Sequence, residues 1–95
     1  MFYFMTKYLL RLYITGNSIR SQRAIANLFK ICQEELGDNY RIEIIDVLEE
    51  PHKAEAEKIM VTPTLIKQLP LPLQRIIGDL SNKEKVLLGL DLKSS

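Results

Sequence analysis

The chain has 95 residues, of which 26% are charged, and a formal net charge of +1. This length allows one domain, over residues 1–95, with a modest hydrophobic core. The nearly balanced charge gives no electrostatic reason to expect binding to nucleic acid or to an anionic membrane. The single cysteine, Cys32, and the single histidine, His52, argue against a disulfide framework and a metal centre of the usual ligand count. We therefore expect a cytoplasmic protein without a metal or a cofactor.

The first half of the chain predicts a β-α-β unit. Apolar side chains over residues 8–14 alternate on both faces, which is typical of a strand covered on both sides. Ser18 can then cap a helix whose apolar stripe ends at Gly37. Residues 40–47 alternate again and predict a second strand. A helical crossover between them favours a parallel pair.

The second half begins with a predicted helix and strand. Pro51 is suited to the first turn of a short helix over residues 51–60. Residues 61–66 then predict a strand, with Pro63 near its start, where a missing N–H is tolerated. This adds an α-β pair to the β-α-β unit.

A strand and a helix are predicted to complete the domain. After a stiff connection over residues 69–72, residues 74–77 predict a short strand. The spacing of Ser81 and Glu84 is typical of a capping box, which predicts that Ser81 begins a last helix. The resulting order, β-α-β-α-β-β-α, is that of an α/β domain of the thioredoxin-like class.

The redox chemistry of that class is not supported by the sequence. A thioredoxin carries its cysteine pair just after the first strand, where residues 16–22 contain no cysteine. Thr62-Pro63 resembles the cis-proline site of the fold, but we interpret it as architectural because no thiol opposes it. Cys32 lies on the apolar stripe of the first helix, where packing is favoured over nucleophilic chemistry. We predict no catalytic residue and no enzyme, with a thioredoxin-like redox enzyme as the alternative.

Residues 86–92 fit two incompatible structures. A helix would place Val86, Leu87 and Leu90 on one stripe, whereas a strand would alternate apolar side chains from residue 86 to residue 92. Gly89 weakens a helix interior by about 1 kcal/mol relative to alanine, and Asp91 lies near the negative end of the helix dipole. The local pattern leaves both structures open.

Five stretches covering most of the chain resemble the KaiB family of circadian clock proteins. They are LRLYITGN at residues 10–17, IDVLEEP at 45–51, VTPTLIK at 61–67, RIIGDLSNKEKVL at 75–87 and GLDL at 89–92. The resemblance implies a non-enzymatic regulator that binds the ATPase ring of a KaiC-like protein, a hexameric RecA-like ATPase and autokinase. It would modulate the phosphorylation state or output of that partner in a circadian clock or a related stress or timing system.

The resemblance also implies further partners. A KaiA-like protein and a histidine kinase are candidates, and the alternative within this class is an isolated sensor domain of a KaiC-interacting histidine kinase. The candidate contacts with the KaiC-like ring are Pro51, Lys58, Lys67 and Arg75, with Arg23 on the first helix as a further one.

Members of this family are known for switching between two folds. The resemblance implies a free state of order β-α-β-β-α-α-β, which forms dimers and tetramers, and a partner-bound monomer of order β-α-β-α-β-β-α. Residues 1–50 would form a constant half and residues 51–95 a switching half. Proline isomerisation is slow, so prolines in the second half could slow the exchange. The candidate switching residues are Pro63, Pro70, Pro72, Gly89 and Asp91.

Overall fold

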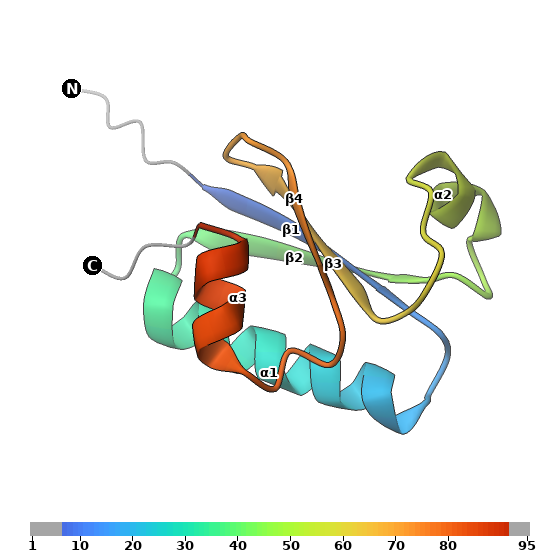
Figure 1. Cartoon of the computed structure of the whole chain (residues 1–95), viewed down its shortest axis with the longest axis horizontal. Coiled ribbons are helices and arrows are strands. Elements are labelled where there is room, and N and C mark those ends of the chain that lie inside the picture. Colours follow the sequence, from blue (N-terminus) through green and yellow to red (C-terminus); the bar gives the residue numbers. More distant parts are fainter. Residues whose placement is uncertain (1–6, 92–95) are drawn as a thin grey trace.

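The computed structural model describes residues 7–91 and contains seven elements in the order β-α-β-α-β-β-α (Figure 1). This confirms the predicted thioredoxin-like order. Their bounds are β1 Tyr8–Ile14, α1 Ile19–Leu36, β2 Tyr40–Asp46, α2 Pro51–Ala56, β3 Thr64–Leu69, β4 Gln74–Ile77 and α3 Lys83–Gly89.

The four strands form one mixed sheet in the order β2-β1-β3-β4. β1 and β2 are parallel because α1 carries the chain back between them, whereas β3 is antiparallel to both β1 and β4. In Figure 1, α1 and α3 lie below the sheet, and α2 lies above its right-hand end. The sheet therefore separates α2 from the other two helices.

The main hydrophobic core lies between the sheet and the pair α1 and α3. It is built from the buried side chains of Leu12, Leu28, Leu65, Val86 and Leu90, among others. Burying an aliphatic side chain of this size contributes about 1.5–3 kcal/mol to folding. This core fixes α3 as well as α1 onto the same face of the sheet.

A much smaller core lies on the α2 face of the sheet. Tyr13, Ile45 and Ile66 are buried there, with Val47 and Ile59 packed against them. Because α2 covers only part of this face, the rest of it is available for polar side chains and for contact with other molecules.

The helix α2 is shorter than the predicted helix over residues 51–60. It ends at Ala56, and Lys58 adopts a positive φ of 56°, a backbone conformation that ends an α-helix. The amide nitrogen of Lys58 donates to the carbonyl oxygen of Glu55, which closes the last turn. Lys58 is thereby turned out of the helix and is exposed.

The strand β3 is shifted relative to the predicted strand over residues 61–66. The hydroxyl of Thr64 donates to the carbonyl oxygen of Val61 at 2.7 Å, which closes a turn where the strand was expected to begin. Pairing with β1 then extends as far as Leu69. The peptide bonds before Pro63, Pro70 and Pro72 are cis.

The last helix begins one residue later than the capping box predicted. The side-chain oxygen of Asn82, and not that of Ser81, accepts a hydrogen bond from the amide of Lys85. The amide of Ser81 instead donates to the carboxylate of Asp79. Of the ambiguous segment, residues 86–89 are thus helical, and Leu90 and Asp91 form a turn rather than a strand. Among residues 7–91, no helix is long and apolar enough to cross a membrane.

Candidate protein-binding surface

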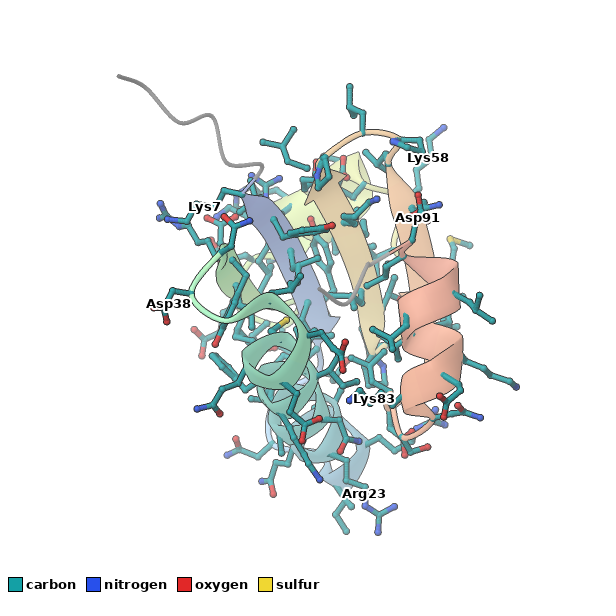
Figure 2. All side chains as sticks on the ribbon, turned by 90° about the vertical axis from the view of Figure 1, so that its left-hand side faces the viewer. Lys7, Arg23, Asp38, Lys58, Lys83 and Asp91 are labelled. Carbon is teal, nitrogen blue, oxygen red and sulfur yellow. The ribbon has the colours of Figure 1, made fainter. Side chains whose placement is uncertain are left out.

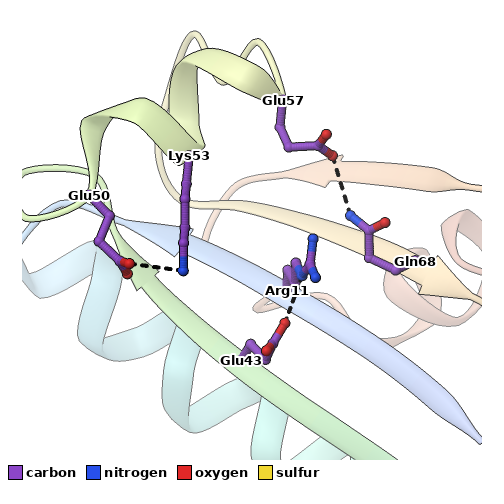
Figure 3. Close-up of polar contacts among 6 residues, drawn as sticks. All are labelled: Arg11, Glu43, Glu50, Lys53, Glu57 and Gln68. Atoms are coloured by element: carbon purple, nitrogen blue, oxygen red, sulfur yellow. Dashed lines mark hydrogen bonds and ion pairs between the residues drawn. The ribbon is translucent and has the colours of Figure 1, made fainter.

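The end of α2 is tied to the sheet through Glu57. Its carbonyl oxygen accepts a hydrogen bond from Nη2 of Arg75 on β4 at 2.6 Å. Its carboxylate accepts another from the amide of Gln68 on β3 at 3.3 Å (Figure 3). These two bonds fix the end of α2, and with it the neighbouring Lys58, beside the outer strand of the sheet.

A cleft of about 470 Å³ lies between α2 and the sheet. Inside it, Nε of Arg11 on β1 lies 2.7 Å from the carboxylate of Glu43 on β2. On α2, Nζ of Lys53 lies 2.9 Å from the carboxylate of Glu50 just before that helix (Figure 3). The cations in this cleft thus already have carboxylate partners, which makes it a poor site for a small anion.

The shifted pKa values in this cleft do not favour proton transfer near neutral pH. The hydrogen bond from Arg11 lowers the pKa of Glu43, and the same bond raises the pKa of Arg11. Burial raises the pKa of Tyr13, which lies beside them. Each of these pKa values moves away from neutrality, so these three groups are not tuned for general acid or base catalysis.

A second cleft, of about 370 Å³, opens at the end of the sheet beside the start of α2. At its base, the hydroxyls of Thr15 and Thr62 share a hydrogen bond. Met60 and Val61 lie on its rim, and Met60 is 88% exposed. Val47 lines the same cleft, and the next residue in the chain, Leu48, is 68% exposed.

We call Leu48, Met60 and Val61 the apolar patch. Large apolar side chains that are exposed together often mark protein-binding sites. The sequence reasoning missed this patch because Met60 was assigned to the predicted helix, Val61 to the predicted strand and Leu48 to the connection before them. Only the tertiary structure reveals their exposure. They provide an apolar complement to the predicted charged contacts.

Three of the five predicted contact residues gather around α2. Pro51 is its first residue, Lys58 follows its end, and Arg75 reaches that end from β4; all three are exposed. Together with the apolar patch, we call them the α2 surface. Arg23 lies on α1, across the sheet, and Figure 2 shows it at the opposite side of the molecule from Lys58.

Lys67 does not offer the surface contact that was predicted for it. Its side chain is only 1% exposed, because β3 is a central strand and Lys67 points to the same face as Leu65 of the main core. Its register partner on β4 is Gln74, whose side-chain oxygen is buried without a hydrogen-bond partner. In this conformation, Lys67 is enclosed by the fold.

The candidate switching residues are spread through the second half of the chain. Pro63 is buried just before β3, and Pro70 and Pro72 lie between β3 and β4. Gly89 is the last residue of α3, and Asp91 follows it with a positive φ of 53°. The second fold implied for these residues stays a prediction.

The position of a thioredoxin redox pair is occupied here by hydroxyl groups. Ser18 caps α1, and its hydroxyl also bonds to that of Ser21, which accepts in turn from the amide of Thr15. The single thiol, that of Cys32, is buried in the main core, and burial raises its pKa to about 12. A thiol with this pKa remains protonated at neutral pH and is a poor nucleophile.

The fold and this site define a thioredoxin-like domain without a redox cysteine pair. Residues 11–92 match the model of the KaiB domain, and the chain belongs to the KaiB family. It is 76% identical over 88 residues to circadian clock protein KaiB3 of Synechocystis sp., covering 93% of this chain and 86% of that protein. It is 54% identical over 85 residues to circadian clock oscillator protein KaiB of Synechococcus elongatus, covering 90% and 83%. These relatives are named as clock proteins.

Solved structures with lower sequence identity show the same fold. The N-terminal domain of SasA from Synechococcus elongatus has a TM-score of 0.73 at 22% identity, covering 93% of this chain and 89% of that one. Mitochondrial thioredoxin 3 from Saccharomyces cerevisiae has a TM-score of 0.71 at 20% identity, covering 92% and 79%.

Proposed function

We propose that this protein is a cytoplasmic regulator that binds the ATPase ring of a KaiC-like protein through the α2 surface. The observation that carries the proposal is the gathering of Pro51, Lys58 and Arg75 beside the apolar patch in a member of the KaiB family. Binding would change the phosphorylation state or the output of the ring. A KaiA-like protein and a histidine kinase are further candidate partners.

The α2 surface combines the features of a protein-binding site. Its apolar patch can be desolvated in the complex, and the surrounding cations can select acidic groups on the partner. Arg75 is also held in place by its bond to the carbonyl of Glu57, so less side-chain entropy is lost when it binds. Lys67 is left out of this surface because it is enclosed.

We further propose that the described fold is the binding-competent monomer and that the free protein also forms dimers or tetramers with a rearranged second half. Two features of this half support a modest energy gap between the folds. The buried oxygen of Gln74 lacks a partner, and Leu88 on α3 is 82% exposed. Such local conflicts weaken one packing arrangement relative to its competitors. Binding would then be slow, over minutes or longer, because conversion precedes docking.

The proposal is tested by mixing the protein with its cognate KaiC-like ring and following complex mass over time by size-exclusion chromatography with light scattering. Met60→Glu and Lys58→Glu should each weaken the complex about tenfold or more, which corresponds to about 1.4 kcal/mol. Lys30→Glu is the matched control, since it makes the same charge change on an exposed position of α1. Absence of a complex after a day, or equal weakening by all three variants, would contradict the proposal.

The proposed role is not enzymatic, and the redox alternative has its own test. Reduction of insulin by a dithiol donor should proceed at the same rate with and without the protein, because its only thiol is buried with a raised pKa. A rate increase that disappears in Cys32→Ser would establish the redox enzyme instead.

A further inference from the structure

The start of α3 is tied to the end of α1 by three charged side chains. Nζ of Lys83, the first residue of α3, lies 2.6 Å from Oε2 of Glu35 and 3.1 Å from Oε1 of Glu34. Both carboxylates belong to the last turn of α1, and Figure 2 shows Lys83 at the start of α3, on the side that faces α1. These ion pairs therefore join two helices that are far apart in the sequence.

Each of these charges lies at the unfavourable end of its own helix. The carboxyl end of a helix carries a partial negative charge, and the last turn of α1 contains Glu34 and Glu35 but no basic residue. The amino end carries a partial positive charge, and Lys83 lies at that end of α3. The packing of α3 against α1 brings the opposite charges together, so the contact compensates an unfavourable interaction in both helices.

The contact with Glu35 is the more protected of the two. Its side chain is 12% exposed, compared with 44% for that of Glu34. A partly buried ion pair is screened less by salt than an exposed one, and it costs more to leave its carboxylate unpaired. Hydrogen bonding to Glu35, and next to Glu34, raises the pKa of Lys83. The pair of Lys83 and Glu35 should therefore be the stronger half of the contact.

A second, uncharged bond holds the loop before α3 on the same helix. The side-chain amide of Asn27 donates to the carbonyl oxygen of Asp79 at 2.9 Å. Residues 27 and 34 are about two helical turns apart, so they lie on the same side of α1. Polar contacts at two points along α1 thus place the loop and the start of α3, and Val86 and Leu90 complete the packing in the main core.

We propose that Lys83, Glu34 and Glu35 form an ionic latch that holds α3 on α1 and so favours the described fold over the rearranged one. This inference rests on the exchange of folds in the proposed function. The glutamates belong to the half that would stay constant and Lys83 to the half that would rearrange, so the latch is closed only while α3 lies on α1. Opening it lowers the population of the described fold, and with it the rate of ring binding.

The test measures how firmly α3 is held in the full chain, by NMR at a concentration at which the chain is monomeric. The amides of Val86 and Leu90, which donate hydrogen bonds to the carbonyl oxygens of Asn82 and Val86, are the probes. Lys83→Glu puts a third carboxylate into the latch. It should speed hydrogen exchange at both probes, or lower the helical population of residues 83–89 where both folds are present, by about fivefold.

Lys85→Glu is the matched control. It makes the same charge change in the first turn of α3, at an exposed position that forms no ion pair within the described part of the chain. Both variants improve the interaction with the dipole of α3, but only Lys83→Glu opens the latch. Lys85→Glu should therefore leave the exchange at both probes unchanged or slightly slower.

Exchanging the two charges and adding salt test the electrostatic origin of the effect. Lys83→Glu combined with Glu35→Lys restores an opposite pair and puts each charge at the favourable end of its helix, so slow exchange should return. Added salt should speed exchange at the probes in the wild type, because it screens the latch, and should have a smaller effect in Lys83→Gln.

Three results would overturn the proposal. The first is an equal effect of Lys83→Glu and Lys85→Glu, and the second is failure of the charge exchange to restore slow exchange. The third is exchange that rises by the same factor in α1 as in α3, which would indicate a general loss of stability. Ring binding is measured separately and should be about fivefold slower for Lys83→Glu. If the wild type formed no complex with the ring, the proposed function would fail, and the exchange data would still decide whether the latch holds α3.

Discussion

Gly89, at the end of α3, lies directly against Ile76 of β4. A Cβ atom on residue 89 would be 2.7 Å from Cδ1 of Ile76 and 3.0 Å from its Cγ1. Non-bonded carbon atoms are ordinarily about 3.5–4.0 Å apart, so any side chain at position 89 would displace Ile76. Sequence reasoning treats Gly89 only as a residue that weakens the helix, whereas in this fold it also lets α3 approach the sheet.

This contact predicts that the effect of Gly89→Ala depends on residue 76. Alanine gains up to about 1 kcal/mol of helix propensity, but much of that is lost as Ile76 moves. Ile76→Val removes Cδ1, the nearer of the two atoms, so in this background Gly89→Ala should raise the free energy of unfolding by the full gain in helix propensity. Urea unfolding of the two single variants and the double variant gives the coupling energy, which we expect to be at least about 0.5 kcal/mol. If Gly89→Ala changed the free energy of unfolding equally in both backgrounds, the contact with Ile76 would not affect stability.

The enclosure of Lys67 predicts that Lys67→Met stabilises the described fold. The side chain of Lys67 is only 1% exposed and forms no ion pair with any of residues 7–91, so folding removes most of a charged side chain from water without a carboxylate partner. Methionine keeps an unbranched side chain that can pack in the same space. The free energy of unfolding in urea should therefore rise by about 1 kcal/mol. Lys58→Met, at an exposed position, is the control and should change it by less than about 0.5 kcal/mol.

The pair of Arg11 and Glu43 predicts a contribution to stability that depends on pH. Because the pKa of Glu43 is lowered in the folded state, the contribution is present above its ordinary value of 4.5 and is lost as the pH falls through the folded value. Both side chains are more than one-third exposed, so Glu43→Gln should cost no more than about 1 kcal/mol at pH 7. The free energies of unfolding of the wild type and the variant should converge below pH 4.5. A difference between them that grows as the pH falls would show that the carboxylate is not stabilised by Arg11.

The environment of Cys32 predicts that its thiol is unreactive in the native protein. The side chain is 0% exposed, and its pKa is raised to about 12 by burial. Ellman's reagent at pH 8 should label it only as fast as the core opens, and in denaturant it should react at once. Fast labelling of the folded protein would mean that α1 exposes this part of its packing face.

The order of the elements and the class of fold could be predicted from local patterns. Alternating apolar side chains predicted β1 and β2, and helical spacing predicted α1, because backbone geometry sets the direction of side chains within a few residues. Pro51 predicted the first residue of α2. The boundaries of the helices and strands were harder to predict where two neighbouring side chains could both act as the helix cap. Asn82 caps α3 in place of Ser81, whose amide donates instead to the carboxylate of Asp79.

By itself, the sequence determined the family, the absence of thiols after β1 and the apolar stripe that buries Cys32. Only the tertiary structure decided which charged residues are exposed and which lie together. It encloses Lys67, brings Arg75 to the end of α2 and separates Arg23 from Lys58. The physical reason is that burial and proximity depend on strand order and helix packing between distant segments, whereas a lysine or an arginine has the same local pattern on either side of a sheet.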